Sequence, residues 1–341
     1  MTTTADAEVP ATEPDEIPQQ RQNPVQAMLH AHPSLGPFAV LVVAAVVFEI
    51  INVRFFNPAN LSIMLQQVAM IGLLALGQSI IILTAGIDLS VGAAMILSQM
   101  VMAGLAVNQG VPGLLAFLIG LIAALATGLV NGLLVTRFRV PPFIATLGTL
   151  GVFTAVGLKY ANGQTITPSG GNFLLWTGKI IKLGTFHITT GVLIMLVAYI
   201  LVGVALGRTA WGRHVYSVGD DLEASRLVGI PTTRVLFSVY VAAGVIFGIA
   251  AWVQIGRVGD ASTNISSTLN LDSITAAVIG GISLFGGRGV VVGTLFGALI
   301  VQVFQNGLAL AGVPDLYQQL AEGVLVILAV TVDQWIRKVR R

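Results

Sequence analysis

From Pro37 to the end of the chain, long apolar runs follow one another with only short polar breaks. A helix needs about 20 apolar residues to cross the hydrocarbon core of a membrane. The spacing predicts ten helical segments, of which three, Phe38–Val53, Phe143–Leu158 and Asp272–Phe285, look short or broken. The others are Ser62–Thr84, Leu89–Val107, Pro112–Val135, Ile188–Gly207, Val235–Ile255, Val290–Ala311 and Leu316–Trp335. We therefore predict an all-α, polytopic membrane protein with about ten transmembrane helices.

The scarcity of charge supports this class. Charged residues make up 9% of the 341 residues, whereas soluble domains carry about 25%. The water-facing surface of a chain this long would need more polar cover, so composition excludes a soluble enzyme, a coiled coil and a disordered protein. The absence of Cys and the scatter of the four His predict no disulfide and no metal centre. The basic balance is slight, so we expect no nucleic-acid partner.

Residues 1–34 differ from the rest of the chain. They hold five acidic residues against one basic residue, and five prolines interrupt any helix there. This composition predicts a disordered, acidic, Pro-rich tail ahead of a transmembrane domain over residues 35–341. The tail is not a signal peptide, because it lacks a basic start followed by an apolar run.

The basic residues predict the topology. With ten spans and the N-terminus inside, twelve Arg and Lys fall on the cytoplasmic side and five outside. The positive-inside rule therefore favours both termini in the cytoplasm. The cytoplasmic set is Arg21, Arg137, Arg139, Arg208, Arg213, Arg226, Arg234, Arg288, Arg337, Lys338, Arg340 and Arg341.

A faint two-fold repeat runs through the chain. Gly86–Gly92 (GIDLSVG) is similar to Gly281–Gly287 (GISLFGG), and an Asn-Gly-Leu followed by Val-Pro comes after each. Small residues at every fourth position between these motifs predict two helix faces where backbones approach closely. Duplicated halves with Gly-broken helices are typical of transporters. The small residues are Gly120, Ala124, Gly128 and Gly132 in one half and Gly289, Gly293 and Gly297 in the other.

The sequence carries no nucleotide site of the P-loop type. Of the four lysines only Lys179 follows a glycine, and Ile180 stands where Ser or Thr is required. No spacing of carboxylates or His indicates a catalytic or metal site.

The most polar stretch outside the tail is the loop 208–234. Asp220 or Asp221 can cap a short helix over Leu222–Val228, which Gly229 and Pro231 would end. Gly219 is expected to end the element before it. A capped helix of this kind suits docking into a groove of a partner, although an ordinary connecting loop is the simpler interpretation.

Three stretches resemble the permease subunits of ribose-, xylose- and arabinose-type ABC sugar importers, in the branched-chain amino acid and sugar permease superfamily. Leu83–Gly92, Pro142–Thr149 and Gly280–Gly289 match the family's conserved patterns. The loop resembles its coupling loop, G-R-x-x-Y-A-x-G-x-N-x-x-A-A-x-x-x-G-I, although Ser217, Asp221 and Ser225 depart from it. The coupling residues assigned are Gly212, Arg213, Tyr216, Gly219, Asp220, Asp221, Glu223, Ala224, Arg226 and Gly229.

The resemblance implies the other subunits of a transport complex. Such permeases pair in the membrane, receive a sugar from a periplasmic binding protein and are driven by a separate cytoplasmic ATPase, which holds ATP and Mg. It implies a multi-pass protein of the bacterial inner membrane that binds no cofactor and is not itself an enzyme. An ion-coupled secondary transporter, or a permease for another small polar solute, is the alternative.

Polar residues inside the apolar runs are the candidates for the pathway. Asp88 is costly at membrane depth, so it either caps the helix that follows it or serves the pathway. Uncharged polar side chains could bind sugar hydroxyls in transit, with helix–helix hydrogen bonding as the alternative for each. The candidate pathway residues are Gln66, Asp88, Gln99, Asn131, Gln302 and Asn306. Glu322 is left out of this set and is expected to be paired or at an interface.

Overall fold

The computed structural model describes residues 34–263 and 268–338. The chain is mostly helical, with one short β-hairpin. Ten of the helices in the described residues are α2 (Leu35–Ile51), α3 (Pro58–Ile82), α4 (Val91–Asn108), α5 (Gly113–Thr136), α6 (Pro142–Tyr160), α7 (Thr190–Arg208), α10 (Thr232–Val258), α11 (Leu269–Ile279), α12 (Val291–Leu310) and α13 (Asp315–Lys338). The tail predicted over residues 1–34 lies outside the described residues, apart from Ser34, which precedes α2.

Each of the ten predicted segments overlaps one of these helices, with ends that differ by a few residues. Within the described residues, seven helices are long and apolar enough to cross a membrane; α2 and α11 are shorter apolar helices, and α13 falls outside both groups. The chain is thus a polytopic membrane protein, and the count of ten crossings stays a prediction. Phe143–Leu158, expected to be short or broken, lies in the continuous 19-residue helix α6.

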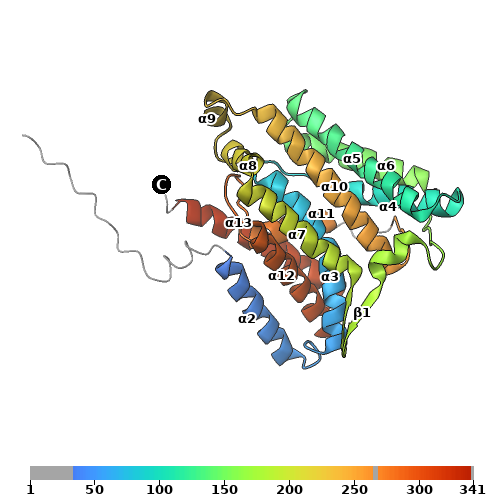
Figure 1. Ribbon diagram of the computed structural model, residues 1–341. Helices are drawn as coiled ribbons and strands as arrows, with labels where there is room; N and C mark the ends of the chain where they lie inside the picture. Colours follow the sequence, from blue (N-terminus) through green and yellow to red (C-terminus); the bar gives the residue numbers. More distant parts are fainter. Residues whose placement is uncertain (1–33, 264–267, 339–341) are drawn as a thin grey trace, which may run out of the picture. The chain divides into compact units, whose positions relative to one another are not determined.

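Helix α3 forms the centre of the fold. In its most apolar stretch 83% of the residues are buried, against 28% in α5 and in α6. Helices α10, α11 and α12 pack against α3, while α5 and α6 lie toward one edge, as Figure 1 shows. An apolar helix that is buried all round is a core helix, whereas the exposed apolar faces of α5 and α6 suit contact with lipid.

Small residues allow the closest helix contacts. On α5, Gly120 faces Met102 and Ser98 of α4, and the following three positions of the predicted face lie against α10. A Cβ on Gly128 would overlap the carbonyl oxygen of Tyr240 and lie 3.2 Å from the Cα of Gly244. Ala124 and Gly132 face Gly248 and Phe237 in the same way. The every-fourth-residue pattern on α5 therefore marks a face where two helix backbones cross in contact.

The second small-residue face is shorter than the sequence suggests. Gly293 and Gly297 lie on α12 against Gly280 and Ala276, at the end of α11. Gly289, placed on the same helix face by its spacing, precedes α12 and has a φ of 127°. That backbone conformation is open only to glycine, so Gly289 shapes the loop before the helix rather than its packing face.

The described residues are mostly helical, but they include a short β-hairpin that was not part of the all-α prediction. Between α6 and α7 lie the 3₁₀ helix η1 (Phe173–Gly178) and the antiparallel strands β1 (Ile180–Leu183) and β2 (Phe186–Thr189). Trp252 of α10 stacks on Phe173, with ring centroids 5.0 Å apart, and holds this region against the end of α10. Figure 1 places β1 at the opposite end of α7 from α8 and α9.

Candidate functional site

Two short helices, α8 (Ala210–Asp220) and α9 (Leu222–Leu227), make up the coupling hairpin. The Asp221 side chain accepts a hydrogen bond from the Ala224 N–H at 2.9 Å and caps α9. Gly229 follows with a φ of 85°, a left-handed conformation that ends the helix where the sequence predicts. Gly219 does not end an element, contrary to expectation, because α8 continues through it to Asp220.

The hairpin is attached to the membrane helices by side-chain hydrogen bonds. Trp211 donates to the Ser238 hydroxyl of α10 at 2.7 Å, and the Tyr216 hydroxyl donates to the Gly289 carbonyl at 2.9 Å. Burial raises the pKa of the Tyr216 phenol above its ordinary value near 10, so the hydroxyl stays protonated and able to donate. The hairpin is therefore linked directly to α10 and to the loop that precedes α12.

The hairpin presents both charge and apolar surface. Arg213, Asp220, Asp221, Glu223, Ala224 and Arg226 are exposed, while Gly212 and Gly219 are buried. At its tip Leu227 is 88% exposed and Val228 is 76% exposed. These two residues lie outside the seven described helices that are long and apolar enough to cross a membrane. Exposed apolar side chains with a polar rim are typical of a protein-binding surface.

Three motif segments meet at one point, here called the glycine junction: Leu83, Gly219, Gly286 and Gly287. The Gly287 N–H donates to the Leu83 carbonyl at 3.0 Å. A Cβ on Gly219 would overlap that same carbonyl oxygen and lie 2.7 Å from the Gly287 nitrogen. A Cβ on Gly286 would lie 2.5 Å from the Gly219 carbonyl oxygen. Only glycine allows this approach. It joins the coupling hairpin to residues 83–90 and to residues 280–290, the two broken-helix motifs.

Residues 83–90, the first of these motifs, double back into the protein after α3. The Gln78 amide, in the orientation that satisfies both of its groups, pairs with the Asp88 backbone at 3.2 and 3.3 Å. Asp88 is ten residues later in the chain, so the segment returns alongside the last turns of α3. Helix α4 consequently starts inside the fold, where an irregular backbone is tolerated because protein surrounds it.

Asp88 lies at the centre of a buried polar network. It is 2% exposed, and its Oδ1 accepts from the Ser90 N–H at 2.7 Å and from the Ser90 hydroxyl at 2.6 Å. Asn131 of α5 donates to Asp88 Oδ2 at 3.2 Å and accepts from Thr149 of α6 at 2.7 Å. The carboxylate thus holds the start of α4 and links it to α5 and α6.

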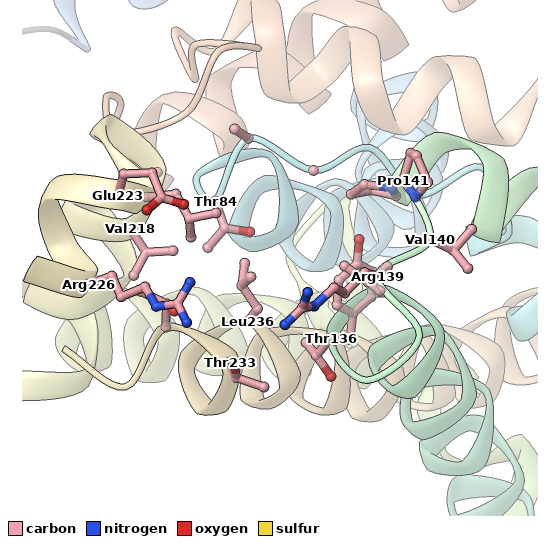
Figure 2. A pocket seen from close by; sticks show the side chains of 18 of the residues that line it. Thr84, Thr136, Arg139, Val140, Pro141, Val218, Glu223, Arg226, Thr233 and Leu236 are labelled. Carbon is pink, nitrogen blue, oxygen red and sulfur yellow. The ribbon is translucent and has the colours of Figure 1, made fainter. Parts of the chain in front are cut away.

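A cavity of about 740 Å³, the proximal cavity, lies beside the coupling hairpin. Its walls come from the hairpin, from residues 84–86, from the loop 139–142 and from the start of α10. Figure 2 shows the guanidinium groups of Arg139 and Arg226 extending into it from opposite walls, with Thr84 and Glu223 nearby. A movement of the hairpin would therefore change the shape of this cavity directly.

The other candidate pathway residues do not lie together in the structure. Gln302 and Asn306 line a second cavity of about 430 Å³, the distal cavity, between α3, α11, α12 and α13. Gln99 donates to the Ser262 carbonyl at 2.6 Å. Gln66 is half-buried and lines neither cavity, whereas its neighbour Gln67 lines the distal one. Asp272, which the sequence did not mark, and Glu322, which was left out of the pathway set, also line the distal cavity, and the packing of α11 against α13 brings them together. The expectation that Glu322 is paired is confirmed by its hydrogen bond from Gln305.

Comparison with known proteins decides the family. Residues 60–330 match the family of branched-chain amino acid transport system permease components. The chain belongs to this family. The permease is 44% identical over 320 residues to the fructose import permease protein of Rhizobium meliloti, covering 92% of this chain and 89% of that one.

Other relatives are named for other sugars. The permease is 40% identical to the ribose import permease protein of Bacillus subtilis (strain 168), with 88% of this chain and 92% of that one covered. It is 30% identical to the galactose/methyl galactoside import permease protein of Escherichia coli (strain K12), covering 87% and 93%. No solved structure matches. A permease component moves a solute across a membrane and is not an enzyme.

Proposed function

We propose that this chain is the membrane subunit of an ATP-driven importer for a monosaccharide. Its relatives are named for the import of fructose, ribose and galactose, which supports this substrate class. The observation that carries the ATP-driven mechanism is the coupling hairpin. It combines an exposed, partly apolar tip with a glycine junction to both broken-helix motifs.

The partners in this proposal are a separate ATPase, a periplasmic sugar-binding protein and a second permease chain, most simply an identical copy. The ATPase would hold ATP and Mg, since this sequence lacks a P-loop. This chain would hold no cofactor.

The finer topology is part of the same proposal. Ten crossings, with both termini in the cytoplasm of a bacterial inner membrane, would place the coupling hairpin and Arg139 on the cytoplasmic side. The proposed two-fold repeat is supported by the parallel places of two motifs. Residues 83–90 follow α3 and precede α4, and residues 280–290 follow α11 and precede α12.

The geometry suggests how ATP would open and close the pathway. When the ATPase closes on ATP, it would carry α9 with it, and Ser217 and Ser225, hydrogen-bonded at 2.8 Å, would transmit the movement to α8. The glycine junction would pass it to the starts of α4 and α12. The solute would then gain access to the pathway alternately through the proximal and the distal cavity. The free energy would come from tighter ATP binding to one of the two conformations.

Replacing Glu223 by Lys together with Ala224 by Trp tests the hairpin as the ATPase contact. Both side chains are exposed, so the fold should tolerate the change, while ATP hydrolysis should no longer drive uptake. A Lys182→Glu variant on the exposed strand β1 is the control, because it changes charge away from the hairpin. Sugar-stimulated ATP hydrolysis equal to that of the unchanged complex would contradict the proposed contact.

A further inference from the structure

We propose that the distal cavity is a low-affinity binding site for the sugar in transit, in which side-chain pairs exchange their hydrogen bonds for bonds to sugar hydroxyls. This inference rests on the proposed function and adds the place where the permease itself touches its substrate. Helix α10 shows that the two cavities lie at opposite ends. Thr232 and Thr233 at its start line the proximal cavity, and Arg257 near its other end lines the distal cavity.

The distal cavity also extends deep into the protein. Ile71, which lies near the middle of the 25-residue helix α3, is part of its wall. A volume of about 430 Å³ falls within the range of about 300–1,000 Å³ for small-molecule sites. A cavity of this size, which reaches half-way along a central helix, is placed to receive a solute that leaves a binding protein outside.

The lining is polar, although it is built from apolar helices. Gln302 of α12 is 3% exposed and donates to Gln67 of α3 at 2.5 Å. Gln305, on the same helix, donates to the Glu322 carboxylate of α13 at 2.7 Å. Asp272 of α11 is 4% exposed and also faces the cavity. Buried polar and ionisable side chains at membrane depth are costly, and they mark substrate pathways.

These groups match the chemistry of a monosaccharide. Each sugar hydroxyl is both a donor and an acceptor, amides offer both functions, and carboxylates accept. A hydroxyl that enters between Gln302 and Gln67, or between Gln305 and Glu322, replaces one hydrogen bond by two to the sugar. Met70, Ile71 and Leu269 provide an apolar wall for the carbon–hydrogen face of the ring. Because hydrogen bonds between side chains are lost as hydrogen bonds to the sugar form, the net gain is small. Sugar binding therefore stays weak and its release stays fast.

A small cation is the competing occupant, because the carboxyl groups of Asp272, Asp315 and Glu322 line the cavity together with the guanidinium of Arg257. Arg257 places a positive charge on the wall, held by hydrogen bonds of 3.1 and 3.2 Å to Gln254. The Glu322 oxygen nearest to Gln305 already accepts from an amide N–H, which a cation would have to displace. The amide pairs and the apolar wall favour a neutral, hydroxyl-rich solute over a cation, and protection by sodium in the experiment below would show the opposite.

Cysteine protection measures occupancy directly, because the chain has no Cys of its own. Gln319 is exposed and lines the distal cavity, so Gln319→Cys places a single thiol at its rim. Gln109→Cys in the exposed loop after α4 is the matched control outside the cavity. Each variant is assembled with the ATPase and labelled with a water-soluble thiol reagent in fructose, ribose or galactose.

A transported sugar at ten times its Kd should slow labelling of Gln319→Cys about tenfold and leave Gln109→Cys unchanged, following the factor 1 + [L]/Kd. Adding Gln302→Ala to Gln319→Cys should remove the protection, because it deletes a side chain that would bind the sugar hydroxyls. Equal labelling with and without a sugar that the complex demonstrably imports would overturn the site and leave the proposed function standing. Protection by sodium instead of sugar would also overturn it. Failure of the unchanged complex to import any sugar would refute the proposed function itself.

Discussion

Replacing Gly219 by Ala should uncouple ATP hydrolysis from sugar uptake. The added Cβ would overlap the Leu83 carbonyl oxygen, lying 2.7 Å from the Gly287 nitrogen and 2.9 Å from the Leu83 carbonyl carbon. Ordinary contacts of a Cβ atom lie at 3.4–4 Å, so the hairpin must move away from both neighbours. The contact atoms are backbone, which cannot rotate aside as a flexible side chain would.

Overpacking of this kind costs about 1–3 kcal/mol. If that cost falls on the coupled arrangement alone, the equilibrium between the coupled and uncoupled hairpin shifts about 5- to 150-fold. The Gly287–Leu83 hydrogen bond of 3.0 Å is expected to break, because it spans the gap that the new methyl group opens. Helix α8 should remain folded, since alanine is a good helix former.

The assay is the number of sugar molecules imported per ATP hydrolysed, in vesicles that hold the permease and its ATPase. Gly203→Ala is the matched control, because Gly203 lies in helix α7 with no atom near the position of a new Cβ. Gly219→Ala should lower the ratio at least several-fold, and Gly203→Ala should leave it unchanged. An unchanged ratio in Gly219→Ala, with the protein folded, would refute the reasoning about the junction.

Three further changes test other parts of the account. Asp221→Ala removes the cap of α9 and should cost about 0.5–2 kcal/mol in ATPase docking, measured as a weaker Kd; Asp220→Ala, next to it and exposed, should cost less. Leu227→Asp should weaken docking by about 1.5–3 kcal/mol if the leucine is buried by the partner, without changing the melting temperature of the permease alone. Asp88→Asn replaces one of the two carboxylate oxygens, Oδ1 that accepts from Ser90 or Oδ2 that accepts from Asn131, by an amide N–H, so it should lower stability by about 1–3 kcal/mol; an unchanged melting temperature would count against the network.

Local signals in the sequence were sufficient to predict the ten apolar helices and helix α9 of the coupling hairpin. Ten apolar runs each gave a helix, because hydrophobicity and length are properties of a contiguous segment. Asp221 and Gly229 mark the start and end of α9 for reasons that lie within a few residues. The β-hairpin at 180–189 was missed, since four-residue strands between two membrane helices leave too short a pattern to recognise.

The distal cavity and the junction depend on residues far apart in the chain. Gln302 and Gln67 are separated by 235 positions, and Gln305 and Glu322 lie on different helices. Gly289 shows the converse error, because a four-residue spacing placed it on a helix that begins only after it. Motif resemblance marked Leu83 and Gly287 as special, but only the fold brings them together with Gly219.

The most direct test of the central claim is sugar uptake by vesicles that contain the purified chain with and without its ATPase. The account predicts uptake of a monosaccharide only when the ATPase, ATP and the binding protein are all present, because this chain has no P-loop of its own. Uptake by the chain alone, driven by a sodium or proton gradient, would contradict it.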